Sequence, residues 1–125
     1  MIETDFDTFG QMLDDIMEAM PPELFKGLNG GVNLLPDALP HPEAKHGDLY
    51  ILGQYHRGGL MGRYITIHYG SFIHLFGSHR PDFLRRKLDE VLRHELLHHL
   101  ESLAGEKDLE IQDAIDMERY RRRGR

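Results

Sequence analysis

Residues 81–105 have the sequence PDFLRRKLDEVLRHELLHHLESLAG, which predicts a long helix. Pro81 suits the first position of a helix, where a backbone N–H is not needed. Leucines recur at helical spacing through the stretch. Gly105 is the kind of residue that ends a helix. The apolar positions drift around the axis until the C-terminal half is apolar on nearly all sides, so we expect a central, buried helix.

The helix carries the motif H-E-x-x-H at His94-Glu95-Leu96-Leu97-His98. Residues four apart lie one above the other, so His94 and His98 can direct two imidazoles toward one metal ion. Glu95 lies about 100° around the axis from His94, close enough to reach a water bound to that ion. This spacing is typical of zinc hydrolases. The competing interpretation is a helix whose histidines are ordinary surface or core residues.

Composition limits the ligands that a metal could have. The chain has 125 residues and no cysteine. Its length fits one domain with a modest core. Without cysteine, disulfides and thiolate metal sites are excluded, so any metal must be held by imidazole and carboxylate. The acidic first residues lack the features of a signal peptide, and no apolar run reaches membrane-spanning length, so we expect a cytoplasmic protein.

Charge is distributed unevenly along the chain. Residues 119–125 contain five of the 15 basic residues, and the remaining 10 basic and 21 acidic residues give the first 118 positions a net charge of −11. Such an acidic body argues against a nucleic acid as the partner. We therefore predict a single domain over residues 1–118 and a basic C-terminal tail over 119–125. The tail is interpreted as a solvated helix end, with docking to an anionic partner as the alternative. Its cations are Arg119, Arg121, Arg122, Arg123 and Arg125.

Two helices are predicted before the middle of the chain. The first is capped by Thr4 or Asp5 and ends before Pro21-Pro22. The second is short, covers residues 22–28 and ends at the Asn29-Gly30-Gly31 run. A proline-rich loop follows over residues 36–42. The histidines in and after this loop, His41 and His46, are interpreted as exposed.

The middle of the chain predicts β structure. Residues 48–55 form one strand, 56–59 supply turn residues, and 63–69 form a second strand rich in β-branched and aromatic residues. Residues 71–76 are a third extended segment or a short helical turn. His68 and His74 are more typical of surface positions than of metal ligands. With a final helix from Asp108 to about Arg122, the elements predict an α+β fold with helices flanking a small mixed or antiparallel sheet.

A strand pair followed by a long helix bearing His94-Glu95-Leu96-Leu97-His98-His99 resembles the minimal zincins, a family of small predicted bacterial zinc metallopeptidases. The likeness extends from the first helix through Asp108. It implies a zincin-like fold in which the H-E-x-x-H helix packs on the sheet. It also implies that His94 and His98 bind Zn²⁺ and that Glu95 is the catalytic general base.

The family's longer pattern, H-E-x-x-H-x-x-G-x-x-D, uses its Asp as the third zinc ligand. Here Glu101 and Ala104 occupy the Gly and Asp positions, and Gly105-Glu106-Lys107-Asp108 restores G-x-x-D four residues later. This makes Asp108 the predicted third ligand, with Glu101 and Glu110 as alternatives. The extension adds about 6 Å of helix, so the chain after it has to fold back further. His99 points away from the metal side and is expected to pack or to form hydrogen bonds.

The resemblance implies hydrolysis of a peptide or protein substrate. Three protein ligands leave the fourth zinc position to a water, whose pKa the ion lowers. Glu95 takes the proton of this water and passes it to the leaving amine. An extended substrate would pair with the strand at 63–69. Tyr64, His68 and Tyr69 are the candidate oxyanion donors.

Non-enzymatic roles are the alternative. A small domain without disulfides gains stability from a bound metal, so the chain could be a metal-stabilised binding module. The absence of Gly and Asp at the expected offset favours that interpretation. A protein-partner adaptor, docking through the acidic body or the arginine tail, is the other possibility.

Overall fold

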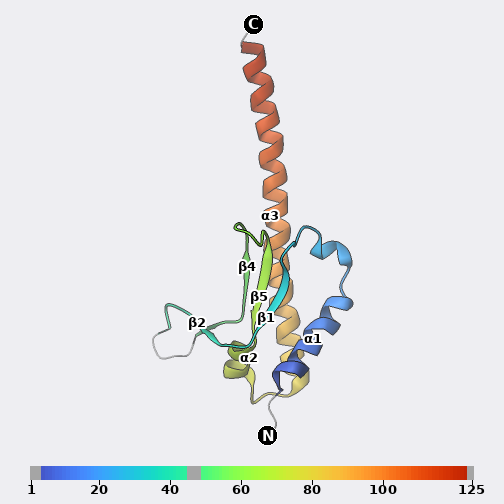
Figure 1. Ribbon diagram of the computed structural model, residues 1–125, viewed down its shortest axis with the longest axis vertical. Helices are drawn as coiled ribbons and strands as arrows, with labels where there is room; N and C mark the ends of the chain where they lie inside the picture. Colours follow the sequence, from blue (N-terminus) through green and yellow to red (C-terminus); the bar gives the residue numbers. More distant parts are fainter. Residues whose placement is uncertain (1–3, 45–48, 124–125) are drawn as a thin grey trace.

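The computed structural model describes residues 4–44 and 49–123, with 107–113 and 118–123 as backbone alone. Figure 1 shows a long helix, α3 (Pro81–Arg123), with a small sheet and the other helices gathered along its first half. An α+β fold with a long helix on a mixed sheet is thereby confirmed. No helix in the described part of the chain has the length and apolar character needed to cross a membrane. The other elements are α1 (Phe6–Glu18), the 3₁₀ helix η1 (Pro22–Phe25), β1 (Gly31–Leu35), β2 (Leu39–Pro40), β3 (Tyr50–Ile51), β4 (Gly53–His56), β5 (Tyr64–His68) and α2 (Tyr69–Phe76).

The main sheet has the strand order β1-β5-β4, so β5 is its central strand. The predicted strand pair is present and is antiparallel, because β4 pairs with β5 from Gly53 opposite Ile67 to His56 opposite Tyr64. β1 was not predicted, and it pairs with β5 in parallel. Its partner strand lies more than 30 residues further along the chain, and nothing in the five residues of β1 signals such a pairing.

A second, two-stranded sheet joins β2 and β3 in the antiparallel sense. β2 lies inside the segment that we predicted to be a proline-rich loop. The strand predicted over 48–55 is interrupted at Leu52, which separates β3 from β4. The Leu52 carbonyl accepts a hydrogen bond from the backbone N–H of His68 at 2.9 Å, so the interruption stays attached to the main sheet.

The N-terminal helices pack the sheet and α3 together. α1 begins where predicted, and Asp5 is its cap, with the carboxylate accepting a 2.7 Å hydrogen bond from the Thr8 N–H. This hydrogen bond lowers the pKa of Asp5.

The predicted second helix is shorter than expected and is the single turn η1. Of the two alternatives for residues 71–76, the helical one is correct. The core contains Phe9, Leu13 and Ile16 of α1, Ile65 and Ile67 of β5, Phe72 of α2, and Leu84, Leu88, Leu92 and Leu96 of α3.

Two predictions for α3 are wrong. The helix does not stop at Gly105 but continues to Arg123, so the separate helix from Asp108 is its continuation. A glycine ends a helix by taking a left-handed conformation, and Gly105 has no positive φ. The C-terminal half is also not buried on all sides, since Leu97 is 52% exposed. Its other side is buried, with Leu96 and His99 at 2% and 0% exposure, and Figure 1 shows that only the last part of α3 extends beyond the sheet, with no other described element beside it.

Candidate metal centre

His94 and His98 lie one turn apart on the exposed side of α3, and their rings meet edge to face. The two Nε2 atoms are 3.1 Å apart, which is also a hydrogen-bonding distance for neutral imidazoles. Two zinc–nitrogen bonds at the tetrahedral angle would separate the nitrogens by about 3.3 Å. The separation of the two nitrogens is therefore within a few tenths of an ångström of the spacing that a single zinc ion requires.

Glu95 lies on the neighbouring side of the helix and is 7% exposed. It faces Gly53 of β4, where an added Cβ would lie 3.4 Å from the Glu95 Cγ and 2.8 Å from the Val91 Cγ1. A glycine at this position lets the helix approach the strand closely. Burial raises the pKa of the Glu95 carboxyl, and the positive charges of His94, His98 and His56 oppose part of that rise. A carboxylate with a raised pKa is a stronger base at neutral pH.

Clefts open on both sides of Glu95. One, of about 370 Å³, lies toward the C-terminal half of α3 and is bounded by strand β4 and its turn. The other, of about 350 Å³, lies toward β3 and is the more apolar of the two. An extended ligand could therefore cross the histidine pair from one cleft to the other. The first cleft is lined by Tyr55, Arg57, Glu95, His98, Glu101 and Ser102. The second is lined by His41, Tyr50, Ile51, Leu52, Gly53, Glu90, Val91, His94 and Glu95.

No third ligand is in place beside the histidine pair among the described side chains. Within that part of the chain, no group of three His, Asp or Glu residues is placed to hold a metal. Glu101 lines the first cleft without completing such a group. The side chains of Asp108 and Glu110 lie outside the described residues. The fold-back on which the Asp108 prediction depended is absent, because ten residues of unbroken helix carry the backbone about 15 Å beyond His98.

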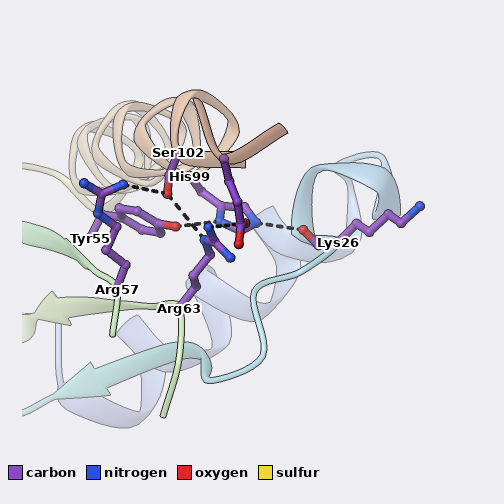
Figure 2. A network of polar contacts seen from close by, with 7 residues as sticks. Lys26, Tyr55, Arg57, Arg63, His99 and Ser102 are labelled. Carbon is purple, nitrogen blue, oxygen red and sulfur yellow. Dashed lines mark hydrogen bonds and ion pairs between the residues drawn. The ribbon is translucent and has the colours of Figure 1, made fainter. Parts of the chain in front are cut away.

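His99 is fully buried and has the structural role that we predicted. Its Nε2 lies 2.7 Å from the carbonyl oxygen of Lys26, which can only accept, so Nε2 carries the proton. In the tautomer with its proton on Nε2, Nδ1 is the acceptor, and the Tyr55 hydroxyl donates to it at 2.9 Å. Figure 2 shows this chain from Tyr55 through His99 to Lys26. The network holds the Tyr55 ring as one wall of the first cleft.

The prediction that an extended substrate pairs with the strand at 63–69 is wrong. β5 is the central strand, and its hydrogen-bonding groups are used by β1 on one side and by β4 on the other. β4 is the edge strand of the described sheet, and its first residue, Gly53, is the one against α3. The element that an extended peptide could join is therefore β4.

The predicted oxyanion donors do not line either cleft. Tyr69 donates to the carbonyl of Thr4 at 2.6 Å, and the Tyr64 ring stacks on His56. His68 is buried rather than on the surface, with its Nε2 3.3 Å from the Gln54 side-chain oxygen.

Of the other predicted surface histidines, His74 is exposed and its ring lies against Tyr50. His41 is half-buried and lines the second cleft. His46 lies outside the described residues.

Sequence reasoning missed three residues of the first cleft, namely Tyr55, Arg57 and Ser102. Ser102 could have been found, because it is four residues after His98 and seven after Glu95 and therefore shares their side of the helix. Arg57 was interpreted only as a turn residue. Its position near α3 depends on a contact between residues 45 apart in the sequence.

No protein-family model matches the chain, and no curated protein matches it. Its fold is similar to the solved structure of a conserved hypothetical protein from Thermo thermophilus, with a TM-score of 0.72 and 32% sequence identity. The alignment covers 82% of this chain and 99% of that chain. The fold thus defines the class of this protein: an α+β protein with a mixed sheet and a histidine pair on its long helix. The chain belongs to the same family as this conserved hypothetical protein.

Proposed function

We propose that the protein is a zinc-dependent peptide hydrolase in which His94 and His98 hold the zinc ion and Glu95 is the general base. The observation that carries the proposal is the 3.1 Å separation of the two Nε2 atoms on adjacent turns of α3. The donor set supports it too, since imidazole and carboxylate are the ligands of catalytic zinc sites. In this proposal, α3 and the sheet form a zincin-like arrangement.

The chemistry requires a base beside the histidine pair. Zinc, when bound, supplies a water of lowered pKa and polarises a carbonyl. Glu95 is one residue from His94 and is shielded from solvent by β4. Its raised pKa suits a carboxylate that accepts a proton near neutral pH and then donates it to a leaving amine.

The substrate would bind along β4. The Leu52 carbonyl points toward β5, where it accepts from His68, so alternation along an antiparallel strand turns the backbone groups of Gly53 and Tyr55 toward the free edge. Leu52 and Gly53 line the same cleft as His94. A peptide that adds to this edge would place its backbone beside the histidine pair.

The third ligand is a testable part of the proposal. Of the three carboxylates considered, Glu101 is the one that lines the cleft beside His98, whereas Asp108 and Glu110 follow ten and twelve residues after His98 on the same unbroken helix. We expect one of the variants Asp108→Asn, Glu101→Gln and Glu110→Gln to lower zinc affinity, because removing a zinc ligand removes a coordinate bond. Competition with a chelating dye would measure the affinity of each. Unchanged affinity in all three would mean that none of these carboxylates is the ligand.

The function itself is tested with Glu95→Gln. We expect this variant to retain zinc, measured by elemental analysis, and to lose cleavage of a peptide library. Asp82→Asn, about three and a half turns earlier on the same helix, is the matched control and should retain both properties. Absence of zinc uptake by the unaltered protein would refute the proposal, and full turnover by Glu95→Gln would remove Glu95 as the base.

A second candidate function is a metal-stabilised binding module without catalysis. The observation in its favour is that, among the described side chains, no third ligand is in place beside the histidine pair. In this case chelation would lower the melting temperature while no peptide in the library is cut. Cleavage that depends on Glu95 would exclude it.

A further inference from the structure

Two arginines meet the same serine at the first cleft. Arg57, which follows β4, and Arg63, which precedes β5, each donate to the Ser102 hydroxyl at 3.4 Å. Figure 2 shows the two guanidinium groups converging on this hydroxyl from the two ends of the turn that joins the strands. A serine oxygen has two lone pairs and can accept both hydrogen bonds. The contact brings two positive charges to one point on α3.

The charges of the two arginines are balanced differently. Arg63 forms an ion pair with Glu106, with 2.6 Å between Nη2 and Oε2. Among the described residues, Arg57 has no carboxylate within ion-pair distance, and its hydrogen-bond partner is the neutral Ser102 hydroxyl. The lack of a carboxylate partner for Arg57 is not due to burial of its side chain, because Arg57 is exposed. Within the described part of the chain, the Arg57 guanidinium therefore has no carboxylate beside it and keeps donors that are not used in a hydrogen bond.

This free guanidinium lies beside the candidate metal centre. Arg57 lines the cleft of about 370 Å³ that also contains Glu95 and His98. Besides Glu95, the described side chains that line this cleft include one acidic group, the exposed Glu101, and it forms no ion pair with Arg57. A bound carboxylate would gain two parallel hydrogen bonds from Arg57 and would be repelled by Glu101.

We propose that this cleft binds a carboxylate of the substrate, with Arg57 as the specificity-determining residue. The carboxylate belongs to an acidic side chain or to the C-terminus of the peptide, since both present the same two oxygens. The identification of its bearer as a substrate rests on the proposed hydrolase function. Ser102 positions the Arg57 guanidinium, while the charge of Arg63 is balanced by Glu106.

The proposal is tested by NMR titration of the full-length chain without added metal. The probes are acetyl-glutamate amide against acetyl-glutamine amide, and acetyl-alanine against acetyl-alanine amide. We expect the charged member of at least one pair to bind at millimolar concentration, with shifts at Arg57 and Ser102, and its neutral partner to bind more weakly. The pair that discriminates identifies the source of the carboxylate. Equal binding of charged and neutral members in both pairs would overturn the proposal.

Two variants, one that removes a positive charge and one that removes a negative charge, make the test more specific. Arg57→Gln should weaken binding of the charged probe about fivefold, and Glu101→Gln should strengthen it about twofold, as expected for single exposed charges. Arg86→Gln, which removes an exposed arginine of α3 outside this cleft, is the control and should change nothing. An unchanged dissociation constant in Arg57→Gln would show that the arginine only fastens the turn to α3.

The test is independent of zinc. It gives its result on metal-free protein, so a chain that takes up no zinc would refute the hydrolase and leave the carboxylate site to be decided by the titration. Conversely, a zinc-binding hydrolase that shows no carboxylate preference would refute the site alone.

Discussion

Replacing Gly53 with alanine tests the close approach of β4 to α3, on which the position of Glu95 depends. The added Cβ would lie 2.8 Å from the Val91 Cγ1, 3.3 Å from the Ile67 Cδ1 and 3.4 Å from the Glu95 Cγ. Ordinary carbon–carbon contacts are about 3.5–4.0 Å, so the contact with Val91 is short by about 1 Å. Gly53 has no positive φ, so the effect of the substitution is steric rather than conformational.

The expected loss follows from this contact. Ile67 can move its terminal methyl, but Val91 is β-branched and stiff at χ1, so the helix or the strand must shift. Overpacking of this kind costs about 1–3 kcal/mol. Alanine recovers about 0.5–1 kcal/mol relative to glycine inside a strand. From the middle of each range, we therefore expect Gly53→Ala to lower the free energy of unfolding by about 1 kcal/mol.

Urea denaturation monitored by circular dichroism measures the loss, provided that the m-value is unchanged. The double variant Gly53→Ala/Val91→Ala should be more stable than the sum of the two single changes predicts, by about 1 kcal/mol, because the second change removes the clashing methyl. Gly10→Ala is the control, since its Cβ would meet only Leu34 at 3.5 Å. Wild-type stability of Gly53→Ala, or strict additivity in the double variant, would refute the reasoning.

Three further variants test other contacts of the fold. Tyr55→Phe should lower the free energy of unfolding by about 1–3 kcal/mol, measured with urea, because it leaves the buried His99 Nδ1 without a donor. Gly70→Ala should cost about 3 kcal/mol or more, measured by thermal melting, because its Cβ would collide with the backbone nitrogen of Ala38. Burial, together with the charge of His56, lowers the pKa of His68 below 6.5, so the unfolded chain binds the proton first and stability falls as the pH drops through that value. Urea titrations from about pH 7 to 5 should therefore show a smaller loss of stability in His68→Gln, and an identical loss would contradict the assignment.

Local patterns predicted the elements whose signals lie within a few residues. Asp5 caps α1 through a contact with Thr8, three positions along. The alternation in residues 64–68 identified β5, and the glycines after His56 identified the turn before it. These features depend on neighbours in the chain, so they can be derived without knowing the fold.

Signals that depend on distant partners were missed or misinterpreted. β1 is stabilised by parallel pairing with β5, more than 30 residues away, and nothing in the five residues of β1 predicts this strand. Gly105 resembles a helix end, but a single glycine costs only about 1 kcal/mol inside a helix, which the rest of α3 tolerates. The substrate strand was misassigned for the same reason, since alternation identifies a strand but not whether it is central or at an edge.

The sequence alone determined the relation of His94, Glu95 and His98 to one another, because the period of the helix sets it. The tertiary structure decided that Glu95 is buried against Gly53 while the two histidines remain open to solvent. It also decided that Arg57 reaches Ser102 beside them. These contacts join residues more than 40 positions apart, and only the packing of the sheet on α3 brings such residues together.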